Sequence, residues 1–450
     1  MRYWLFTWLA LTAAAEGALG EQSQVLWERS SDRESLWERS SDRDLEIAPT
    51  SQVLEIGPDD DVRAVIAALH PGDELLLRGG TYRLDRGFRI SVNGTAAQPV
   101  VIRASGPDAA TFYQTNPRHN VIEIKDSSHL QIRGLTFTGG SHGIRLMASD
   151  HITIADSEIF ETGDVALSAN AGGTYRGLRL LRNHIHHTNG SGEGMYLGCN
   201  RDACRVVDSL IEGNYIHHTD GPTVTQGDGI EVKEGSYGNV IRNNVIHDTH
   251  YPGILVYGTV GNGPANLIES NFVCRSRDNG LQAAADAIIR NNVIIGAPVA
   301  FQPHQRGRPS NIEFSRNTVV TAGHALTVRN ATGPVTLAHN ALYSQQGRAI
   351  RLVGSASNLV ALTGNVGAGG VSTSTRGYRE QGGIDAAHGQ EDGGSGTTDV
   401  AAPGSTLLSL AELTAARDSD GGYDCARLAE VLLRRQARDG QKGRIAHFPQ

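Results

Sequence analysis

The sequence predicts an all-β solenoid of about ten or more coils, and three observations lead to that prediction. Short apolar strands recur between residues 120 and 370 at spacings of 20 to 35 residues. An asparagine stands just before a short strand in eight of these repeats. Glycine accounts for 54 of the 450 residues, which exceeds its usual share and suits tight corners. Irregularly spaced short strands with Gly and Asn corners are typical of a solenoid, in which each coil packs on its neighbours.

Two registers define the repeat. One aligns an apolar residue from each strand: Ile122, Ile144, Ala166, Met195, Ile230, Ile254, Leu281, Phe301, Leu326 and Ile350. The other aligns the corner asparagines Asn183, Asn214, Asn244, Asn271, Asn292, Asn317, Asn340 and Asn365. Asn tolerates corner conformations, and stacked Asn side chains can hydrogen-bond from coil to coil. Helical repeats are excluded because no segment here keeps a 3.6-residue period, and propeller blades of about 40 residues are too long.

The segments outside the repeat have simpler interpretations. Residues 1–20 read as a signal peptide, with Arg2, an apolar stretch and small residues at Ala18–Gly20, so the protein is expected to be secreted or periplasmic and free of the membrane after cleavage. Residues 21–52 form a low-complexity linker in which a ten-residue unit is duplicated. An amphipathic capping helix is expected at 58–69, within a β-helix domain spanning 53–370. Residues 371–404 are Gly/Ser-rich and predicted flexible, and 405–450 contain short helices at 405–417 and 425–437.

The composition excludes some classes of protein and disfavours some partners. Hydrophobic residues make up 39% of the chain and charged residues 20%, which supports a large core and excludes global disorder. The net charge of −8 disfavours a nucleic-acid partner, because phosphate binding needs a basic surface. An acidic polysaccharide remains a candidate partner through a local basic site. Oligomeric state is not predicted.

Four cysteines are too few for a disulfide scaffold at this length. Cys199 and Cys204 flank a short loop and could close it in an oxidising compartment. Two unpaired thiols are the alternative.

Acidic residues recur near the strand starts. Asp164, Glu193 and Asp228 stand two positions before the aligned apolar residue on three successive coils. Stacked carboxylates repel one another, so a divalent cation such as Ca²⁺ is a candidate cofactor at this ladder. A water-screened acidic ladder is the alternative. The longest repeats fall beside these coils, and insertions in a solenoid usually build one functional face.

A histidine column is predicted on another side. His186, His217 and His247 align coil on coil and are expected to face outward. Such a column suits either a transition metal or a neutral hydrogen-bonded ladder.

Lys233 stands out because the chain has three lysines, Lys125, Lys233 and Lys442, among 40 basic residues. In Gly229–Lys233 the alternation of a strand points Ile230 and Val232 inward, so Glu231 and Lys233 are expected to face solvent. The neighbouring coils place Tyr196 under Glu231 and Tyr257 above Lys233. A surface ion pair with a neighbouring Glu is the plain alternative to a catalytic role.

These strand and Asn-corner units, over roughly 75–370, resemble the right-handed single-stranded parallel β-helix of the pectate lyase-like superfamily. The segment Glu231-Val232-Lys233, with Asn239 and Asn244 downstream, resembles the lysine region of the alginate lyase and chondroitinase B family. That resemblance implies Lys233 as the base, with Ca²⁺ held by acidic residues that match Asp228 and Glu193. The family's second basic residue, an arginine on the next coil, is absent from Tyr251–Gly258.

The sequence therefore predicts a secreted polysaccharide lyase that cleaves an acidic, uronate-containing glycan by β-elimination. Lys233 would remove the proton at C5, and Tyr257 or His250 would protonate the leaving oxygen. Tyr196, Glu231, His304 and Arg275 are the candidate substrate-binding residues. Two alternatives stay open: a polygalacturonase-like hydrolase using Asp164, Glu193 and Asp228 as its carboxylates, and a non-catalytic carbohydrate-binding or surface β-helix protein. The glycan, and internal or terminal attack, are not predicted.

Overall fold

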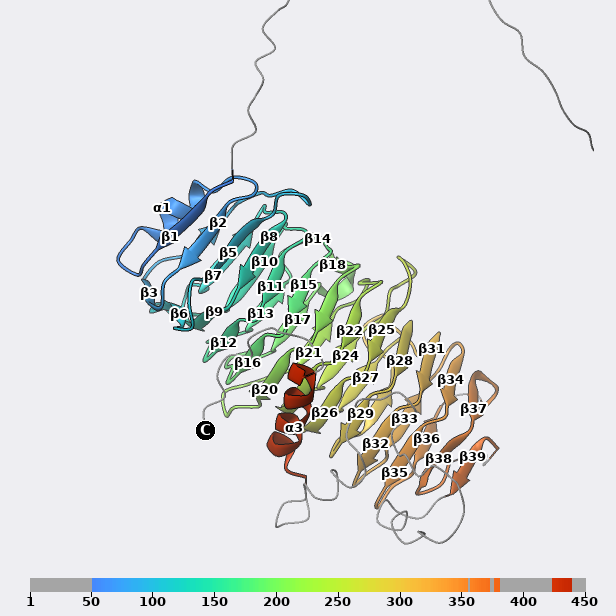
Figure 1. Ribbon diagram of the computed structural model, residues 1–450. Coiled ribbons are helices and arrows are strands. Elements are labelled where there is room, and N and C mark those ends of the chain that lie inside the picture. The colour runs from blue at the N-terminus through green and yellow to red at the C-terminus, as the bar shows by residue number, and fades with distance from the viewer. Residues whose placement is uncertain (1–50, 355–356, 373–375, 381–422, 439–450) are drawn as a thin grey trace, which may run out of the picture. The chain divides into compact units, whose positions relative to one another are not determined.

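The computed structural model describes residues 51–354, 357–372, 376–380 and 423–438. By its contacts the chain divides into residues 1–48 and 49–450, and the first unit lies outside the described residues. The predicted signal peptide, nearly all of the linker and the helix expected at 405–417 also lie outside them. Within the second unit, strands from Val53 to Glu380 form three long parallel sheets, which confirms the predicted right-handed parallel β-helix (Figure 1).

From β2 to β38, successive strands along the chain fall in the three sheets in turn, apart from the short pair β14 and β18. The first sheet has 13 strands: β1 Val53–Ile56, β2 Glu74–Leu77, β5 Val100–Ala104, β8 Leu130–Arg133, β11 Thr153–Ala155, β15 Arg179–Leu181, β19 Leu210–Glu212, β22 Val240–Arg242, β25 Asn266–Glu269, β28 Ala287–Arg290, β31 Ile312–Ser315, β34 Val335–Ala338 and β37 Val360–Thr363.

The second sheet has 11 strands and includes the coil of Lys233. They are β4 Arg89–Ile90, β7 Ile122–Lys125, β10 Ile144–Met147, β13 Leu167–Ala169, β17 Met195–Leu197, β21 Ile230–Val232, β24 Ile254–Val256, β27 Leu281–Ala283, β30 Val299–Phe301, β33 Leu326–Arg329 and β36 Ile350–Val353.

The third sheet has 13 strands and includes the predicted histidine column. They are β3 Gly80–Leu84, β6 Ala110–Gln114, β9 Leu135–Gly139, β12 Glu158–Phe160, β16 His184–His186, β20 Tyr215–Thr219, β23 Val245–Thr249, β26 Phe272–Ser276, β29 Val293–Ile295, β32 Thr318–Thr321, β35 Ala341–Ser344, β38 Asn365–Ala368 and β39 Tyr378–Glu380. A separate pair joins β14 Gly173–Arg176 to β18 Cys204–Val207, and two 3₁₀ turns lie at η1 Asn200–Asp202 and η2 Ser357–Leu359.

The alternation of the strands builds the core. In β7, for example, Ile122 and Ile124 are buried while Glu123 and Lys125 are half-buried on the outer side. Successive coils stack such aliphatic side chains into one continuous hydrophobic interior. A ladder of buried asparagines runs from coil to coil, from Asn183 to Asn365. In it, each side-chain amide donates to the side-chain oxygen of the next Asn at 2.9–3.1 Å. The predicted ladder is confirmed.

Two positions of the predicted strand register are wrong. Leu167, not Ala166, pairs with Ile144 and Met195. Val299, not Phe301, pairs with Leu281 and Leu326. The apolar pattern could not decide which residue of each strand takes the aligned position. Ala166 and Leu167 are adjacent and both buried, and Val299 and Phe301 both point inward.

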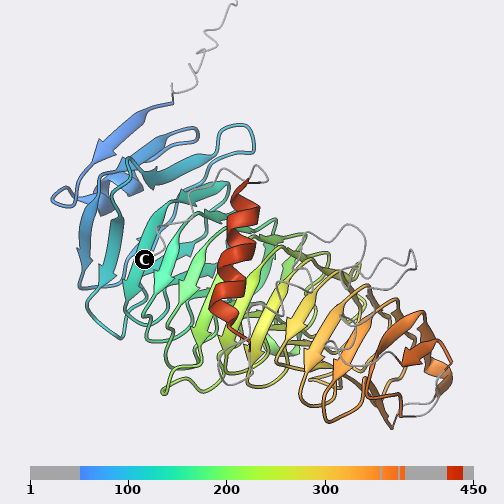
Figure 2. The same ribbon diagram turned by 60° about the horizontal axis from the view of Figure 1, so that its bottom comes forward.

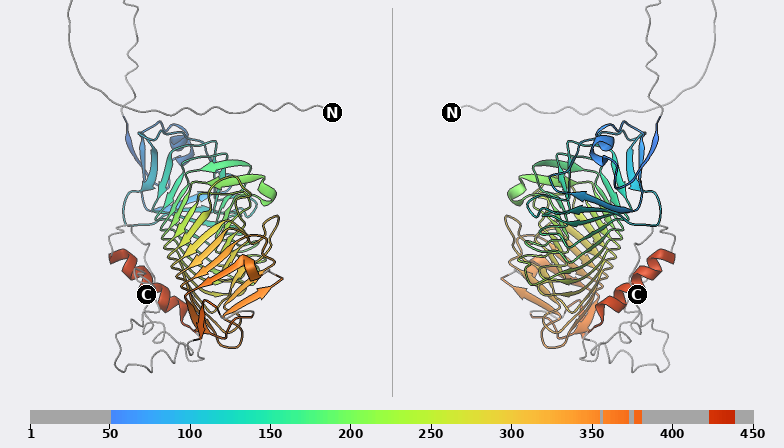
Figure 3. Two further views of the ribbon diagram at one scale, coloured as in Figure 1. Left: turned by 90° about the vertical axis from the view of Figure 1, so that its right-hand side faces the viewer. Right: turned by 90° about the vertical axis from the view of Figure 1, so that its left-hand side faces the viewer.

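The N-terminal helix is shorter than expected. Helix α1 spans Val62–Ala67 rather than 58–69, and Asp61 caps it by accepting hydrogen bonds from the backbone of Arg63 and Ala64 at 3.1 Å. Val62 and Ile66 are buried in the main core. Figure 3 shows α1 at the end of the stack where β1 begins, as a capping helix requires.

At the other end, β39 lies inside the segment predicted flexible from residue 371, because the buried side chain of Tyr378 extends the stack. Helix α3, Cys425–Arg438, matches the second predicted C-terminal helix. It lies across strands β23 and β26 of the third sheet (Figure 2). A disulfide joins Cys425 to Cys274 of β26, and Leu428 and Leu432 pack in a small cluster against that sheet. No helix among the described residues is long and apolar enough to cross a membrane.

Candidate functional site

Lys233 directly follows β21, and its neighbours on adjacent coils are those predicted. Tyr196 pairs with Glu231 on one side. On the other side, Val232 pairs with Val256, which sets Tyr257 beside Lys233. Gly198 lies under Lys233 with a φ of +96°, and a Cβ there would come within 3.0 Å of the Lys233 Cβ. A side chain at Gly198 would therefore displace the lysine.

The amine of Lys233 is held by three kinds of contact. Nζ forms an ion pair with Glu231 Oε1 and donates to the phenolic oxygen of Tyr257 at 3.0 Å. That phenol in turn donates to Glu231 Oε1 at 2.8 Å. Nζ also lies 4.3 Å from the ring centre of Tyr196 and 4.7 Å from that of Tyr257. The ammonium is thus enclosed between two aromatic rings and a carboxylate.

The predicted solvent exposure of this group is wrong. Lys233 is 3% exposed and Glu231 is 1% exposed. The segment after β30 packs on their neighbours: the backbone N–H of Arg306 donates to Glu234 Oε1 at 3.1 Å, and the His304 ring stacks on Tyr257 at 4.5 Å. The alternation of a strand predicts which side chains face outward, but it does not predict that a loop 72 residues away will pack on their neighbours.

A buried carboxylate cluster lies beside the lysine. Glu193, Asp228 and Glu231 each offer an oxygen, and these oxygens lie within 4.8 Å of one another. Both carboxylate oxygens of Glu193 and of Asp228, and Oε2 of Glu231, have no hydrogen-bond partner among the described residues. Unpaired buried carboxylate oxygens are unfavourable without a cation.

Asp164 does not belong to this cluster, which corrects its predicted place in the ladder. The register shift at Leu167 puts Val165, not Asp164, in line with Glu193. Asp164 instead accepts a hydrogen bond from the backbone of Ser191 at 3.1 Å and lies 3.6 Å from Nε2 of His142. Glu231 takes the third place beside Glu193 and Asp228.

Burial dominates the electrostatics of the cluster. Burial raises the pKa of Asp228 well above its usual value, and the neighbouring Glu231 and Glu193 raise it further. Burial likewise raises the pKa of Glu193. Burial and then the charge of Glu231 raise the pKa of Tyr257, so this phenol keeps its proton at neutral pH. Burial, followed by the charge of Lys233, lowers the pKa of His304.

The residues present fit Ca²⁺. Ca²⁺ takes carboxylate oxygens at about 2.3–2.6 Å, so two of its ligands can lie up to about 5 Å apart. The oxygens of Glu193, Asp228 and Glu231 satisfy this limit, and several of them are unpaired.

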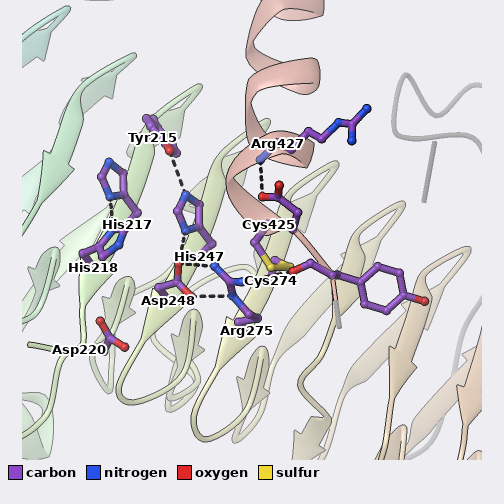
Figure 4. A network of polar contacts seen from close by, with 12 residues as sticks. Tyr215, His217, His218, Asp220, His247, Asp248, Cys274, Arg275, Cys425 and Arg427 are labelled. Atoms are coloured by element: carbon purple, nitrogen blue, oxygen red, sulfur yellow. Dashed lines mark hydrogen bonds and ion pairs between the residues drawn. A yellow bond between two sulfur atoms is a disulfide. The ribbon is translucent and has the colours of Figure 1, made fainter. Parts of the chain in front are cut away.

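Two predicted site residues lie apart from the lysine. No contact in the described part of the chain joins His250 to Lys233, Glu231 or Tyr257, and its ring stacks on Tyr251 at 5.3 Å. Arg275 belongs to the third sheet, where its Nε and Nη2 donate to the two carboxylate oxygens of Asp248 at 2.8 Å (Figure 4). Arg275 is therefore not beside the candidate site, because its strand faces a different side of the coil.

Other features were missed or left open by the sequence. Glu234 is fully buried, and it was not predicted as a site residue although it follows Lys233 directly. The segment around His304 and Arg306 had no sequence signal beyond its polar composition. The Cys199–Cys204 disulfide forms, closing the loop next to Gly198. A cavity of about 470 Å³ lies at the N-terminal cap, lined by residues such as Asp61, Arg63 and Arg86, and is distinct from the Lys233 coil.

Residues 108–226 and 210–365 match the protein family described as the right handed beta helix region, and together they span more than half of the chain. The chain belongs to the right-handed β-helix family. Searching curated proteins gives no match.

Members of this fold with solved structures resemble the chain only distantly. An alginate lyase from Paenibacillus is 23% identical over 69% of this chain and 99% of that one, with a TM-score of 0.45. A mannuronic acid specific polysaccharide family 6 lyase from the human gut microbiota is 17% identical over 73% and 91%, with a TM-score of 0.45. A lacto-N-biosidase from Eubacterium ramulus is 12% identical over 74% and 67%, with a TM-score of 0.42. The activity that each of these names states belongs to that protein alone.

Proposed function

We propose that the protein is a polysaccharide lyase that cleaves an acidic, uronate-containing glycan by β-elimination at the Lys233 coil. The observation that carries the proposal is the direct contact between Lys233 and Tyr257 beside the unpaired carboxylates of Glu193 and Asp228. β-Elimination needs a base for the C5 proton and an acid for the leaving O4, and these two side chains offer both. The similarity to lyases of known structure is compatible with this assignment.

The two roles follow from the local electrostatics. Tyr257 keeps its proton because burial and Glu231 raise its pKa, so it suits the acid that protonates O4. Lys233 is the proton acceptor and must be uncharged to act. Tyr257 is preferred to His250 as the acid because it contacts Lys233 directly.

The carboxylate cluster is assigned to a Ca²⁺ ion held by Glu193, Asp228 and Glu231. When bound there, Ca²⁺ would neutralise a substrate carboxylate. The remaining candidates serve binding: the rings of Tyr196 and His304 border the amine and its tyrosine partner. For substrate to reach Lys233, the segment carrying His304 and Arg306 has to move away from Tyr257 and Glu234.

The 3% exposure of Lys233 favours one competing function, a carbohydrate-binding β-helix without catalysis. Incubation with alginate, pectate and glycosaminoglycans separates the two. A lyase releases unsaturated ends that absorb ultraviolet light, whereas a binder retains the glycan uncut. Reducing ends without absorbance would instead support hydrolysis.

We also propose that the protein is secreted or periplasmic. The supporting observations are the signal-like residues 1–20 and two disulfides, since disulfides persist in oxidising compartments. N-terminal sequencing of protein from the native host should begin near Glu21. Intact Met1 in a cytosolic fraction would refute secretion.

A further inference from the structure

The third sheet presents a group of histidines away from the Lys233 coil. His184 and His186 lie on β16, His217 on β20 and His247 on β23. His186, His217 and His247 stack in the predicted column, with ring centres 5.1 and 5.0 Å apart and ring planes within 6° of parallel. The column is less exposed than predicted: His217 is 9% and His247 1% exposed.

The column itself does not suit one metal ion. Parallel rings translated by 5.0–5.1 Å keep their equivalent nitrogens about as far apart. Zinc–nitrogen distances of about 2.0–2.1 Å limit two ligands of one ion to roughly 4 Å. The ligands of an ion must therefore come from side chains next to the column.

Glu158, His184 and His186 meet this requirement. Glu158 Oε1 lies 3.4 Å from His184 Nδ1 and 3.3 Å from His186 Nε2. Ligands at about 2.0–2.1 Å in a tetrahedron are separated by roughly 3.3–3.4 Å. The contact of His186 with Glu158 also satisfies the distance of a long hydrogen bond, so these side chains are held together with or without an ion. The two carboxylate–imidazole distances therefore match ligands around one ion, and all three ligand atoms lie within 4.8 Å of one another.

The second nitrogen of each imidazole also has a partner suited to a metal ligand. His184 Nε2 lies 2.8 Å from His217 Nε2, and His186 Nδ1 lies 2.7 Å from His187 Nδ1. A histidine that binds a metal through one nitrogen usually donates its other N–H to an acceptor. Neutral His217 and His187 can each accept that proton, so both tautomers needed for metal binding are supported.

Solvent can reach the three ligands. The side chains of Glu158, His184 and His186 are 27%, 13% and 14% exposed. They come from β12 and β16, which are adjacent strands, so an ion would join two successive coils.

A second group on the same sheet that could hold a metal ion, His218, His247 and Asp248, is engaged in other contacts. His247 Nδ1 is 2.7 Å from Asp248 Oδ2, a hydrogen-bond distance, and Arg275 occupies both oxygens of Asp248 (Figure 4). Glu158, by contrast, has no ion pair with Lys or Arg among the described residues.

We propose that Glu158, His184 and His186 form a binding site for a transition-metal ion of the Zn²⁺ class, with water at the open fourth position. Imidazole and carboxylate ligands suit such an ion, and three protein ligands leave one position for solvent. The site is separate from the carboxylate cluster at Lys233, whose all-oxygen ligands suit Ca²⁺. The ion would fasten β12 to β16 and stabilise that part of the stack.

The test is calorimetric titration of the metal-stripped, full-length protein with Zn²⁺. The protein should carry no histidine tag, and excess Ca²⁺ should be present to occupy the carboxylate cluster. One Zn²⁺ per chain is expected. Co²⁺ in its place should give the visible absorption of a four-coordinate ion. Added Zn²⁺ should raise the melting temperature, because the ion binds only the folded chain.

Two variants assign the site. His186→Phe keeps a ring to stack on Phe160 and His217 but removes both nitrogens. Glu158→Gln keeps the side-chain shape and removes the charge. Each should weaken Zn²⁺ binding by at least the 10–100-fold that loss of an outer partner causes. His129→Phe is the matched control, because His129 stacks on His151 at 4.6 Å in another histidine pair, and it should bind Zn²⁺ as the parent does.

Absence of Zn²⁺ binding to the parent protein would overturn the proposal. So would unchanged affinity in folded Glu158→Gln, or an equal loss in His129→Phe. Should His186→Phe fail to fold, Glu158→Gln and the Co²⁺ spectrum decide the question.

Discussion

Lys233 Nζ lies 3.0 Å from the phenolic oxygen of Tyr257, a residue 24 positions further along the chain. The contact exists because β21 and β24 are adjacent strands of the second sheet. It joins a potential proton acceptor to a group whose proton is retained by burial and by Glu231.

Replacing Tyr257 with Phe should lower kcat by about 10²–10⁴-fold if the phenol protonates the leaving oxygen. The ring remains to stack on His304, so KM should change little. Steady-state assay of ultraviolet-absorbing products measures both constants. Tyr251→Phe is the control, since Tyr251 is 41% exposed and lies outside the Lys233 contacts. An unaffected kcat in Tyr257→Phe would leave the acid unassigned.

Ca²⁺ should stabilise the protein through Glu193, Asp228 and Glu231. At a free concentration 100 times its Kd, an ion that binds only the folded chain adds about 2.7 kcal/mol. A chelator should therefore lower the melting temperature of the parent and have no such effect on Asp228→Asn. Asp164→Asn serves as control, because Asp164 lies outside the cluster and accepts from Ser191. Loss of Ca²⁺ stabilisation in Asp164→Asn, with retention in Asp228→Asn, would contradict the ligand set.

Asp248 should stabilise the folded protein at neutral pH and lose this contribution at acid pH. Burial acts to raise the pKa of Asp248, but hydrogen bonds from His247 and Arg275 outweigh it and hold the pKa well below its usual value of 3.8. A depressed folded pKa gives stability above the unfolded pKa that is lost as pH falls below it. Asp248→Asn should thus be about 1–3 kcal/mol less stable at pH 7. Asn suits the positive φ of 55° at this corner.

The stability difference between the parent and Asp248→Asn should shrink as pH falls below about 4. Denaturant unfolding at a series of pH values measures it. A difference that stays constant from pH 7 to pH 2 would show that the ionised carboxylate is not its source.

The Cys274–Cys425 disulfide should fasten helix α3 to the third sheet. It joins residues 151 positions apart, whereas Cys199 and Cys204 are 5 apart. Longer loops lose more chain entropy when closed, so removing the long link should lower stability by about 2–5 kcal/mol. Cys274→Ala/Cys425→Ala should therefore melt lower than Cys199→Ala/Cys204→Ala. The reverse order would indicate that α3 is held by its apolar contacts instead.

The periodic features of the fold were predictable from the sequence because each coil repeats them. The Asn ladder is legible since every member occupies the same corner, and the inward Ile230 and Val232 follow from alternation. The predicted register was wrong at Ala166 and Phe301, because a nearby residue is also apolar and equally buried. The neighbours of Lys233 were predicted from register, but the burial of this coil was not, because Arg306 contacts Glu234 and His304 stacks on Tyr257 from a segment about 70 residues further along the chain. The missed link between Cys274 and Cys425 is of the same kind: no local pattern reports which distant segment covers a strand.

The Lys233→Arg variant provides the most direct test of the central claim. Arg keeps the positive charge but does not release its proton near neutral pH, so it can pair with Glu231 without acting as a base. Lys125→Arg is the matched control: Lys125 occupies the same column four coils earlier, is 37% exposed and pairs with Asp126. Circular dichroism confirms that both variants are folded.

The measurement is the rate of appearance of unsaturated, ultraviolet-absorbing ends on the glycan that the parent protein cleaves. Lys233→Arg should lose at least about 10²–10⁴-fold in kcat, and Lys125→Arg should match the parent. Undiminished lyase activity in folded Lys233→Arg would contradict the assignment of Lys233 as the base.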